Sequence, residues 1–228
     1  MSELLPVFLK LAGRQVVLVG GGQVATAKLR QLLAADAAVR VVAPDVTREI
    51  REAASSAQRL VTVSRRPFEP DDLEGAWFVV AAATPDVNRQ VSEAAEARRI
   101  FVNAVDDPAN ASAFLSGVVR RDGVTLAIST SGAAPALASL LREGLDALLP
   151  RDLAKWVWQA RVERLAWRRD RVPMEARKPR LLRALNALYG GASEREEQAE
   201  SIRFPVAAIS ADRGPRVPWL NAPEDSWL

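Results

Sequence analysis

Three consecutive glycines directly follow a short apolar run near the start of the chain. The run covers residues 15–19, and the six residues after it fit the pattern G-x-G-x-x-A. They are Gly20, Gly21, Gly22, Gln23, Val24 and Ala25. In this pattern the first glycine permits a tight turn, the second lets the backbone approach a pyrophosphate, and the last residue allows close helix–sheet packing, while the helix N-terminus attracts phosphates. We predict a dinucleotide-binding loop here, and a glycine turn without a cofactor is the alternative.

The type of dinucleotide depends on the end of the next predicted strand. An acidic residue about 20 positions after the glycines would hold a ribose 2′-hydroxyl. This stretch offers only Asp45, directly after Pro44. Asp45 comes slightly late, and it is equally well interpreted as a cap for a helix that begins near Thr47. Because no basic cluster follows it directly to bind a 2′-phosphate, we favour NAD over NADP.

A carboxylate is the natural candidate for acid–base chemistry, because the chain contains no histidine and no cysteine. That composition excludes histidine bases, thiolate nucleophiles, Ser-His-Asp triads and zinc–thiolate sites. Asp106 and Asp107 follow a predicted strand at 100–104, and ligands of open α/β sheets bind beyond the carboxyl ends of the strands. Asp106 is therefore a candidate for proton abstraction or metal binding. The alternative is that one of the two aspartates caps the turn before Pro108.

A second polar cluster ends another predicted strand and precedes a helix that begins at Pro135. Its members are Ser129, Thr130, Ser131 and Gly132. The cluster either binds an anionic group or caps that helix, and the sequence leaves both interpretations open.

Alternating strand and helix patterns must position these residues. Strands are predicted at 15–19, 38–42, 60–64, 77–82 and 100–104, and helices at 24–33, 47–57 and 84–98, the last with Thr84 as a capping hydroxyl. Continuous apolar runs are typical of buried parallel strands. Strand–helix alternation with short connections predicts a parallel sheet covered by helices on both faces. We therefore expect an α/β fold whose N-terminal domain, residues 1–112, is Rossmann-like.

The pattern changes after residue 112. Strands at 113–119 and 124–129 flank an Asp-Gly pair that favours a hairpin turn, and a helix is predicted at 135–149. These elements form a small α+β segment at 113–150. Helices at 151–169 and 179–189 predict a C-terminal helical region at 151–190, and residues 191–228 are predicted to be an extension or tail.

Basic residues concentrate in the predicted helical region. Residues 151–190 hold eleven basic and four acidic side chains, against a net charge of +3 for the whole chain. The excess indicates either an anionic partner or a solvated basic face. No helix-turn-helix or aromatic–basic stacking pattern accompanies it, so we expect no nucleic-acid partner.

Two features of the sequence bear on its location. The longest apolar run, 76–83, is far shorter than the ~18–20 residues of a membrane span. The N-terminus lacks a basic-then-apolar leader. We expect a cytoplasmic protein without a membrane partner.

Several blocks of the sequence, taken together, resemble one family. The blocks are Leu5-Pro6-Val7-Phe8; residues 19–25 with Lys28; Ala82-Ala83-Thr84 with Asn88; residues 98–106; and residues 128–132 with Pro135, Leu137-Ala138 and Leu140-Leu141-Arg142. With these blocks, between about residues 5 and 150, the chain resembles the precorrin-2 dehydrogenases, whose fold also forms the N-terminal part of siroheme synthases.

The resemblance implies an activity and a set of site residues. The activity is NAD-dependent oxidation of precorrin-2 to sirohydrochlorin, and some members also insert ferrous iron to give siroheme. Asp106 matches the catalytic aspartate, whereas residues 20–25, Pro44, Asp45, Ala82, Ala83 and Thr84 match segments that contact the cofactor. We expect Asn103 and residues 129–132 to contact the substrate. No fixed metal site is expected, with Asp106 as a transient iron ligand.

The resemblance also implies partners. Family members are homodimers in which the segment after the nucleotide domain mediates dimerisation. The substrate is a tetrapyrrole with eight carboxylates, which gives basic side chains such as Arg161, Arg164 and Arg168 a group to neutralise. The competing hypothesis is a non-catalytic module that binds NAD to regulate a partner and would not need Asp106 or a basic pocket.

Overall fold

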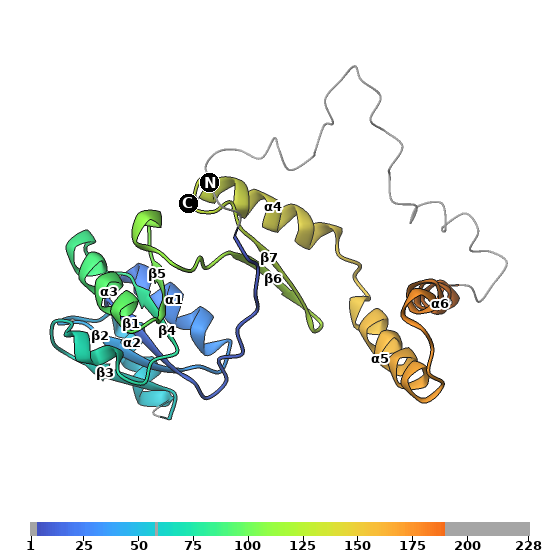
Figure 1. The fold of residues 1–228 in the computed structure, drawn as a ribbon, viewed down its shortest axis with the longest axis horizontal. Helices are drawn as coiled ribbons and strands as arrows, with labels where there is room; N and C mark the ends of the chain where they lie inside the picture. Colours follow the sequence, from blue (N-terminus) through green and yellow to red (C-terminus); the bar gives the residue numbers. More distant parts are fainter. Residues whose placement is uncertain (1–3, 58, 190–228) are drawn as a thin grey trace, which may run out of the picture. The chain divides into compact units, whose positions relative to one another are not determined.

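A computed structural model describes residues 4–57 and 59–189 of the chain. The chain divides after Arg151 into two compact units. The first unit contains a parallel sheet with its helices, a β-hairpin and one long helix, and the described part of the second contains two helices (Figure 1). The predicted tail, 191–228, lies outside the described residues.

A five-stranded parallel sheet forms the centre of the first unit. Its strands are β1 (Gln15–Val19), β2 (Ala38–Val42), β3 (Val61–Ser64), β4 (Phe78–Ala81) and β5 (Phe101–Ala104), in the order β3-β2-β1-β4-β5. The predicted Rossmann-like α/β fold is confirmed, and each predicted strand lies within one residue of the observed ends. The strand order changes direction between β1 and β4, so the carboxyl ends of these two strands form the crevice in which such sheets bind ligands.

Helices cover both faces of the sheet because successive residues of each strand point to opposite sides. Val16 and Leu18 of β1 pack in one apolar cluster with residues of α1 (Gln23–Leu33) and α2 (Arg48–Ser56). Val17 and Val19 pack in the other cluster, with residues of α3 (Pro85–Ala97) and the short 3₁₀ helix η1 (Pro70–Leu73). This two-sided core fixes the carboxyl edge of the sheet, where the candidate site lies.

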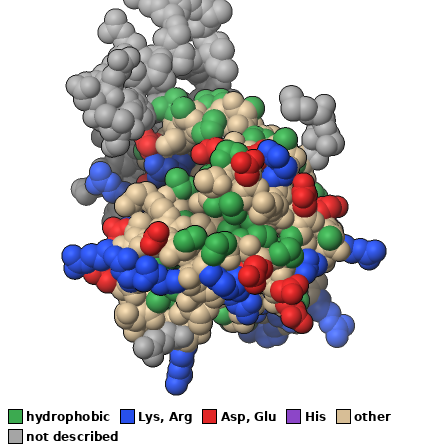
Figure 2. Space-filling view, turned by 90° about the vertical axis from the view of Figure 1, so that its left-hand side faces the viewer, with side chains coloured by type: hydrophobic (Ala, Val, Ile, Leu, Met, Phe, Trp, Pro, Cys, Tyr) green, Lys and Arg blue, Asp and Glu red, His purple; other side chains and the backbone are tan. Residues whose placement is uncertain are grey.

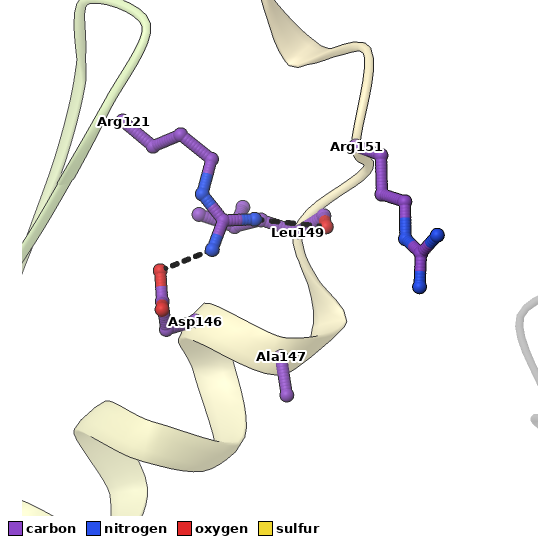
Figure 3. Close-up of a pocket in the computed structure, with 5 residues that line it drawn as sticks. All are labelled: Arg121, Asp146, Ala147, Leu149 and Arg151. Carbon is purple, nitrogen blue, oxygen red and sulfur yellow. Dashed lines mark hydrogen bonds and ion pairs between the residues drawn. The ribbon is translucent and has the colours of Figure 1, made fainter.

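A β-hairpin and a long helix complete the first unit. Strands β6 (Gly117–Arg121) and β7 (Val124–Ile128) pair antiparallel, and α4 (Pro135–Leu148) packs against them. Positive φ angles at Asp122 and Gly123 are those of the hairpin turn that Asp-Gly favours. Arg121 joins the hairpin to the end of α4, because it donates to Asp146 at 2.7 Å and to the carbonyl oxygen of Leu149 at 3.2 Å. Both bonds are drawn as dashed lines in Figure 3, and the residues line a pocket of about 400 Å³.

The first strand of this hairpin begins four residues later than predicted. Residues 113–116 do not belong to β6. Instead, the backbone N–H groups of Ser112 and Ala113 both donate to the carbonyl oxygen of Val102 at 2.9 Å, and the Val102 N–H donates to the Ser112 hydroxyl at 2.9 Å. The prediction was wrong here because this segment satisfies its hydrogen bonds on β5, a long-range contact that alternating hydrophobicity does not reveal.

The described part of the second unit contains α5 (Leu153–Arg169) and α6 (Met174–Ala187). Tyr189 ties them together, because its hydroxyl accepts from Trp156 Nε1 at 2.6 Å and donates to Asp152 at 2.7 Å. The last helix begins five residues before its predicted start, so Pro179 lies inside it. A proline costs an interior position one hydrogen bond but does not end the helix in this case.

The helices and the surface bear on the predicted interactions with membranes and anions. No helix among the described residues is long and apolar enough to cross a membrane. On the side of the first unit where α3 and β3 lie, basic and acidic side chains are interspersed (Figure 2). Recognition of an anion on such a mixed surface depends on particular side chains more than on a broad field of one sign.

Candidate functional site

The glycine loop joins β1 to α1 and packs tightly against two neighbouring segments. A Cβ atom at Gly20, whose φ is +122°, would collide with the carbonyl oxygen of Ala82, and one at Gly21 would collide with the carbonyl oxygen of Asp45. A Cβ atom at Gly22 would have no neighbour within 4 Å. The first two glycines therefore permit backbone-to-backbone packing, whereas Gly22 borders open space where a pyrophosphate could approach the backbone.

Hydrogen bonds fix the loop to the start of α2. The Thr47 N–H donates to the Gly21 carbonyl oxygen at 2.9 Å, and the hydroxyls of Thr26 and Thr47 lie 2.8 Å apart. Thr47 also caps α2, because its hydroxyl accepts from the Ile50 N–H at 3.3 Å. The cap of α2 is thus Thr47 and not Asp45, which resolves one alternative left open by the sequence.

Asp45 instead projects from the loop after β2 toward a basic residue. Its side chain is 94% exposed and lies 3.4 Å from Nη2 of Arg65, which follows β3 directly. Sequence reasoning missed Arg65, because it comes 20 residues after Asp45 and only the parallel pairing of β2 with β3 brings the two together.

The loop after β4 forms the other wall of the glycine loop. The Ala82 N–H donates to the Val19 carbonyl oxygen at 2.8 Å, which continues the pairing of β4 with β1. The Ala83 N–H donates to the side chain of Asn88, a buried residue of α3, at 3.0 Å. Thr84 occupies the cap position of α3 but makes no side-chain capping bond. The predicted capping hydroxyl is therefore wrong, and Asn88 orders this loop instead.

The two aspartates after β5 have different surroundings. The Asp107 carboxylate accepts from Asn110 Nδ2 at 2.7 Å, so Asp107 stabilises the turn that leads into the 3₁₀ helix η2 (Pro108–Asn110). Asp106 is exposed and has a left-handed backbone with φ +57°. The turn-stabilising role thus belongs to Asp107, and Asp106 remains available for chemistry.

Lys28 lies on helix α1, one turn after the glycine loop, and interacts electrostatically with Asp106. Its side chain is half-buried, and burial lowers the pKa of Lys28 below its ordinary value, while the negative charge of Asp106 acts in the opposite direction. An ammonium and a carboxylate therefore share one electrostatic environment at this edge of the sheet. Sequence reasoning did not assign a role to Lys28, although its place one turn after the glycine loop was a usable signal.

The remaining predicted residues lie around the same turn. Gly132, with φ +79°, packs so closely that a Cβ atom would lie 3.1 Å from Cγ of Pro108. This contact brings the cluster at 129–132 next to the Asp106 turn. Within the cluster, the Thr130 hydroxyl accepts from the Ala134 N–H at 3.2 Å and the Ser129 hydroxyl accepts from the Ser131 N–H at 3.1 Å, so both hydroxyls order the loop before α4.

Asn103 is the third residue of β5, and its side chain is buried. Its amide nitrogen donates to the carbonyl oxygen of Ala113 at 3.0 Å, and its oxygen is buried without a partner among the described residues. The structure thus places Asn103 where it supports the segment after the Asp106 turn and presents an unpaired acceptor.

Two family models match this chain. One, described as NAD(P)-binding, matches residues 7–117, and the other, described as sirohaem biosynthesis protein central, matches residues 121–148. The first therefore covers the glycine loop and Asp106, and the second covers most of the hairpin and α4.

Curated relatives and a solved structure agree with these matches. Siroheme synthase 3 of Aeromonas hydrophila subsp. hydrophila is 43% identical over 152 residues, which are 66% of this chain and 32% of the relative. The siroheme synthase of Photorhabdus laumondii subsp. laumondii is 41% identical over 177 residues, 74% of this chain and 37% of the relative. The chain thus spans about a third of the length of these relatives. A solved structure titled SirC, precorrin-2 dehydrogenase, is similar over 87% of this chain and 98% of its own, with a TM-score of 0.65 and 27% identity.

Proposed function

The chain belongs to the precorrin-2 dehydrogenase family of siroheme biosynthesis, and we propose that it oxidises precorrin-2 to sirohydrochlorin with NAD. One observation carries the proposal: the open backbone at Gly22 and the exposed carboxylate of Asp106 lie at the same carboxyl edge of one parallel sheet. Ligands of open α/β sheets bind at that edge.

The residues present fit a nicotinamide dinucleotide. Gly20 and Gly21 hold the loop against the two neighbouring segments, and the space beside Gly22 leaves room for a pyrophosphate at the start of α1. The loop from Gly20 to Ala25, residues 44–45 and residues 82–84 would hold the cofactor. When bound, it supplies an acceptor for a hydride. We propose NAD in particular because Asp45 can accept hydrogen bonds from a ribose.

Asp106 has the role of proton acceptor in this proposal. Oxidation of the macrocycle removes one hydride and one proton, and the chain offers neither histidine nor cysteine as a base. The Asp106 carboxylate is exposed, and the turn contacts around it are made by Asp107. Lys28 supplies a positive charge that interacts with Asp106, and in this proposal it holds a substrate carboxylate close to Asp106.

Partners follow from the same family. We propose a homodimer formed through α4, because Leu137, Leu141, Leu145 and Leu148 are 37–80% exposed and recur at helical spacing along one face.

Ferrous iron would be a second substrate, delivered to the macrocycle nitrogens with Asp106 as a transient ligand. We also propose a cytoplasmic location.

An anaerobic assay of the whole chain tests the proposal. With precorrin-2 and NAD, the unaltered protein should produce sirohydrochlorin and NADH, each followed by its absorbance. Asp106→Asn, which keeps the shape of the side chain, should lower turnover by about 10²–10⁴-fold while leaving the dinucleotide affinity unchanged. Asp107→Asn is the matched control, because it removes the same charge one residue away.

The outcomes separate the competing functions. Dinucleotide binding without any turnover would refute the dehydrogenase and support a regulatory module instead. Turnover retained by Asp106→Asn but lost by Asp107→Asn would refute the assignment of the catalytic carboxylate. Ferrous iron added after the first step tests iron insertion separately, because siroheme and sirohydrochlorin have different spectra.

A further inference from the structure

An acidic and a basic side chain leave the carboxyl edge of the sheet side by side. Strands β2 and β3 pair with Val42 opposite Ser64, and the Ala43 N–H donates to the Ser64 carbonyl oxygen at 3.1 Å. Asp45 follows the end of β2 and Arg65 follows the end of β3, and their side chains approach to 3.4 Å. The pair is therefore set by the register of the two strands.

The pair lies next to the glycine loop. The backbone of Asp45 touches Gly21 so closely that no side chain fits between them. In this fold the residue at the end of the second strand meets the adenosine ribose, where an acid binds the 2′-hydroxyl of NAD and an arginine accommodates the 2′-phosphate of NADP. Here an acid lies in the loop after the second strand, and an arginine that follows the third strand lies 3.4 Å from it.

Building on the proposed dinucleotide site, we propose that Arg65 binds the 2′-phosphate of NADP, so that the chain accepts NADP as well as NAD. The planar guanidinium can form two hydrogen bonds with a phosphate. It also offsets the charge of Asp45, which alone would repel the phosphate. Asp45 accepts from the ribose hydroxyls of NAD and sets the preference between the two cofactors.

Arg65 can turn from Asp45 to a phosphate at little cost. The two side chains are 60% and 94% exposed, and ion pairs between exposed side chains contribute little to stability because water solvates both charges. Two other arginines differ from Arg65 in their partners. Arg66 bonds to the buried carboxylate of Asp72. Arg48 pairs with Glu52 at 2.6 Å on the surface, with side chains 84% and 58% exposed.

Calorimetric titration of the whole chain with NAD and with NADP tests the proposal without any need for turnover. Arg65→Ala should weaken NADP binding about tenfold or more, which corresponds to the loss of one charge-assisted contact, and leave NAD binding nearly unchanged. Asp45→Asn should have the opposite effect, because it tightens NADP binding and weakens NAD binding. Arg48→Ala is the matched control, since it removes an exposed arginine of the same region.

Each result either supports or overturns the proposal. NADP that does not bind the unaltered protein, or binds Arg65→Ala as tightly, overturns it. So does an equal loss of both cofactors in Arg65→Ala, or a selective loss of NADP in Arg48→Ala. If the unaltered protein binds neither dinucleotide, the proposed cofactor site itself is refuted. If it binds NAD but gives one of the results that overturn the NADP proposal, the cofactor site is not refuted. Circular dichroism of each variant checks that it is folded.

Discussion

Two adjacent glycines should give opposite results when each is replaced by alanine. In Gly21→Ala the new methyl group would collide with the carbonyl oxygen of Asp45 and displace the hydrogen bond from the Thr47 N–H to the Gly21 carbonyl oxygen. Overpacking costs ~1–3 kcal/mol, and the lost hydrogen bond adds ~1 kcal/mol. We expect Gly21→Ala to lower the free energy of unfolding by about 2–4 kcal/mol.

Gly22→Ala should instead spare stability and impair binding. Gly22 has φ −83° and ψ −167°, which alanine readily adopts, and a Cβ atom there meets nothing within 4 Å. Alanine is a poorer helix cap than glycine, so a loss below about 1 kcal/mol is expected. The methyl group occupies the space assigned to the pyrophosphate, and NAD affinity should fall by at least about tenfold, or ~1.4 kcal/mol.

Urea unfolding followed by circular dichroism and calorimetric titration with NAD measure the two effects separately. Both variants differ from the unaltered chain by one methyl group at neighbouring positions, so each is the control for the other. If Gly21→Ala unfolds at the same urea concentration as the unaltered protein, the inference that the loop packs tightly at Gly21 is refuted. If Gly22→Ala binds NAD with unchanged affinity, the pyrophosphate does not lie beside Gly22.

Three further predictions concern other parts of the first unit. Lys28→Met should lower turnover at least about tenfold, because it removes the positive charge beside Asp106. The free energy of unfolding should stay equal or rise, because methionine fills the half-buried position without a charge. An unchanged rate in the anaerobic assay would show that Lys28 is not part of the site. Burial alone would raise the pKa of Asp72, but the hydrogen bonds and charge of Arg66 outweigh it and lower that pKa. The pKa of Asp72 in the folded state then lies below its unfolded value of about 3.9, so the ionised carboxylate stabilises the fold above pH ~4. This contribution to the free energy of unfolding is lost as the pH falls through the folded pKa. Urea titrations at several pH values should show the loss in the unaltered protein but not in Asp72→Asn. Leu141→Glu places a charge on the exposed apolar face of α4 and should convert the proposed dimer to a monomer in light scattering, whereas an unchanged mass would exclude this face from the interface.

Local signals made most of the sheet predictable from the sequence. The run at 15–19 is apolar at nearly every position because β1 is the central strand and is covered on both faces. The glycine pattern and the two aspartates after β5 could also be recognised from the sequence, because each is defined by residues within a few positions of it. The resemblance singled out Asp106, but the turn contact of Asp107 with Asn110 and the left-handed backbone of Asp106 needed the structure.

Long-range contacts explain what the sequence could not predict. Arg65 meets Asp45 only through the pairing of β2 with β3, and Gly21 is required by a collision with a segment more than twenty residues away. The start of β6 was misplaced for a related reason, because Ser112 and Ala113 bond to Val102 of β5. In each case the deciding partner lies on another strand or in the loop that follows it, and the hydrophobic periodicity of a segment does not identify such partners.

The left-handed turn at Asp106 also bears on how this protein could change during evolution. Asparagine and aspartate tolerate such a backbone better than other residues with a side chain, and glycine tolerates it freely. A single nucleotide change converts an aspartate codon to one for asparagine or glycine, and either residue would preserve the turn. A descendant that keeps the nucleotide pocket but has lost its chemistry is therefore one mutation away and would fold normally. The same family of folds can in this way yield nucleotide-responsive proteins without any remodelling of the scaffold.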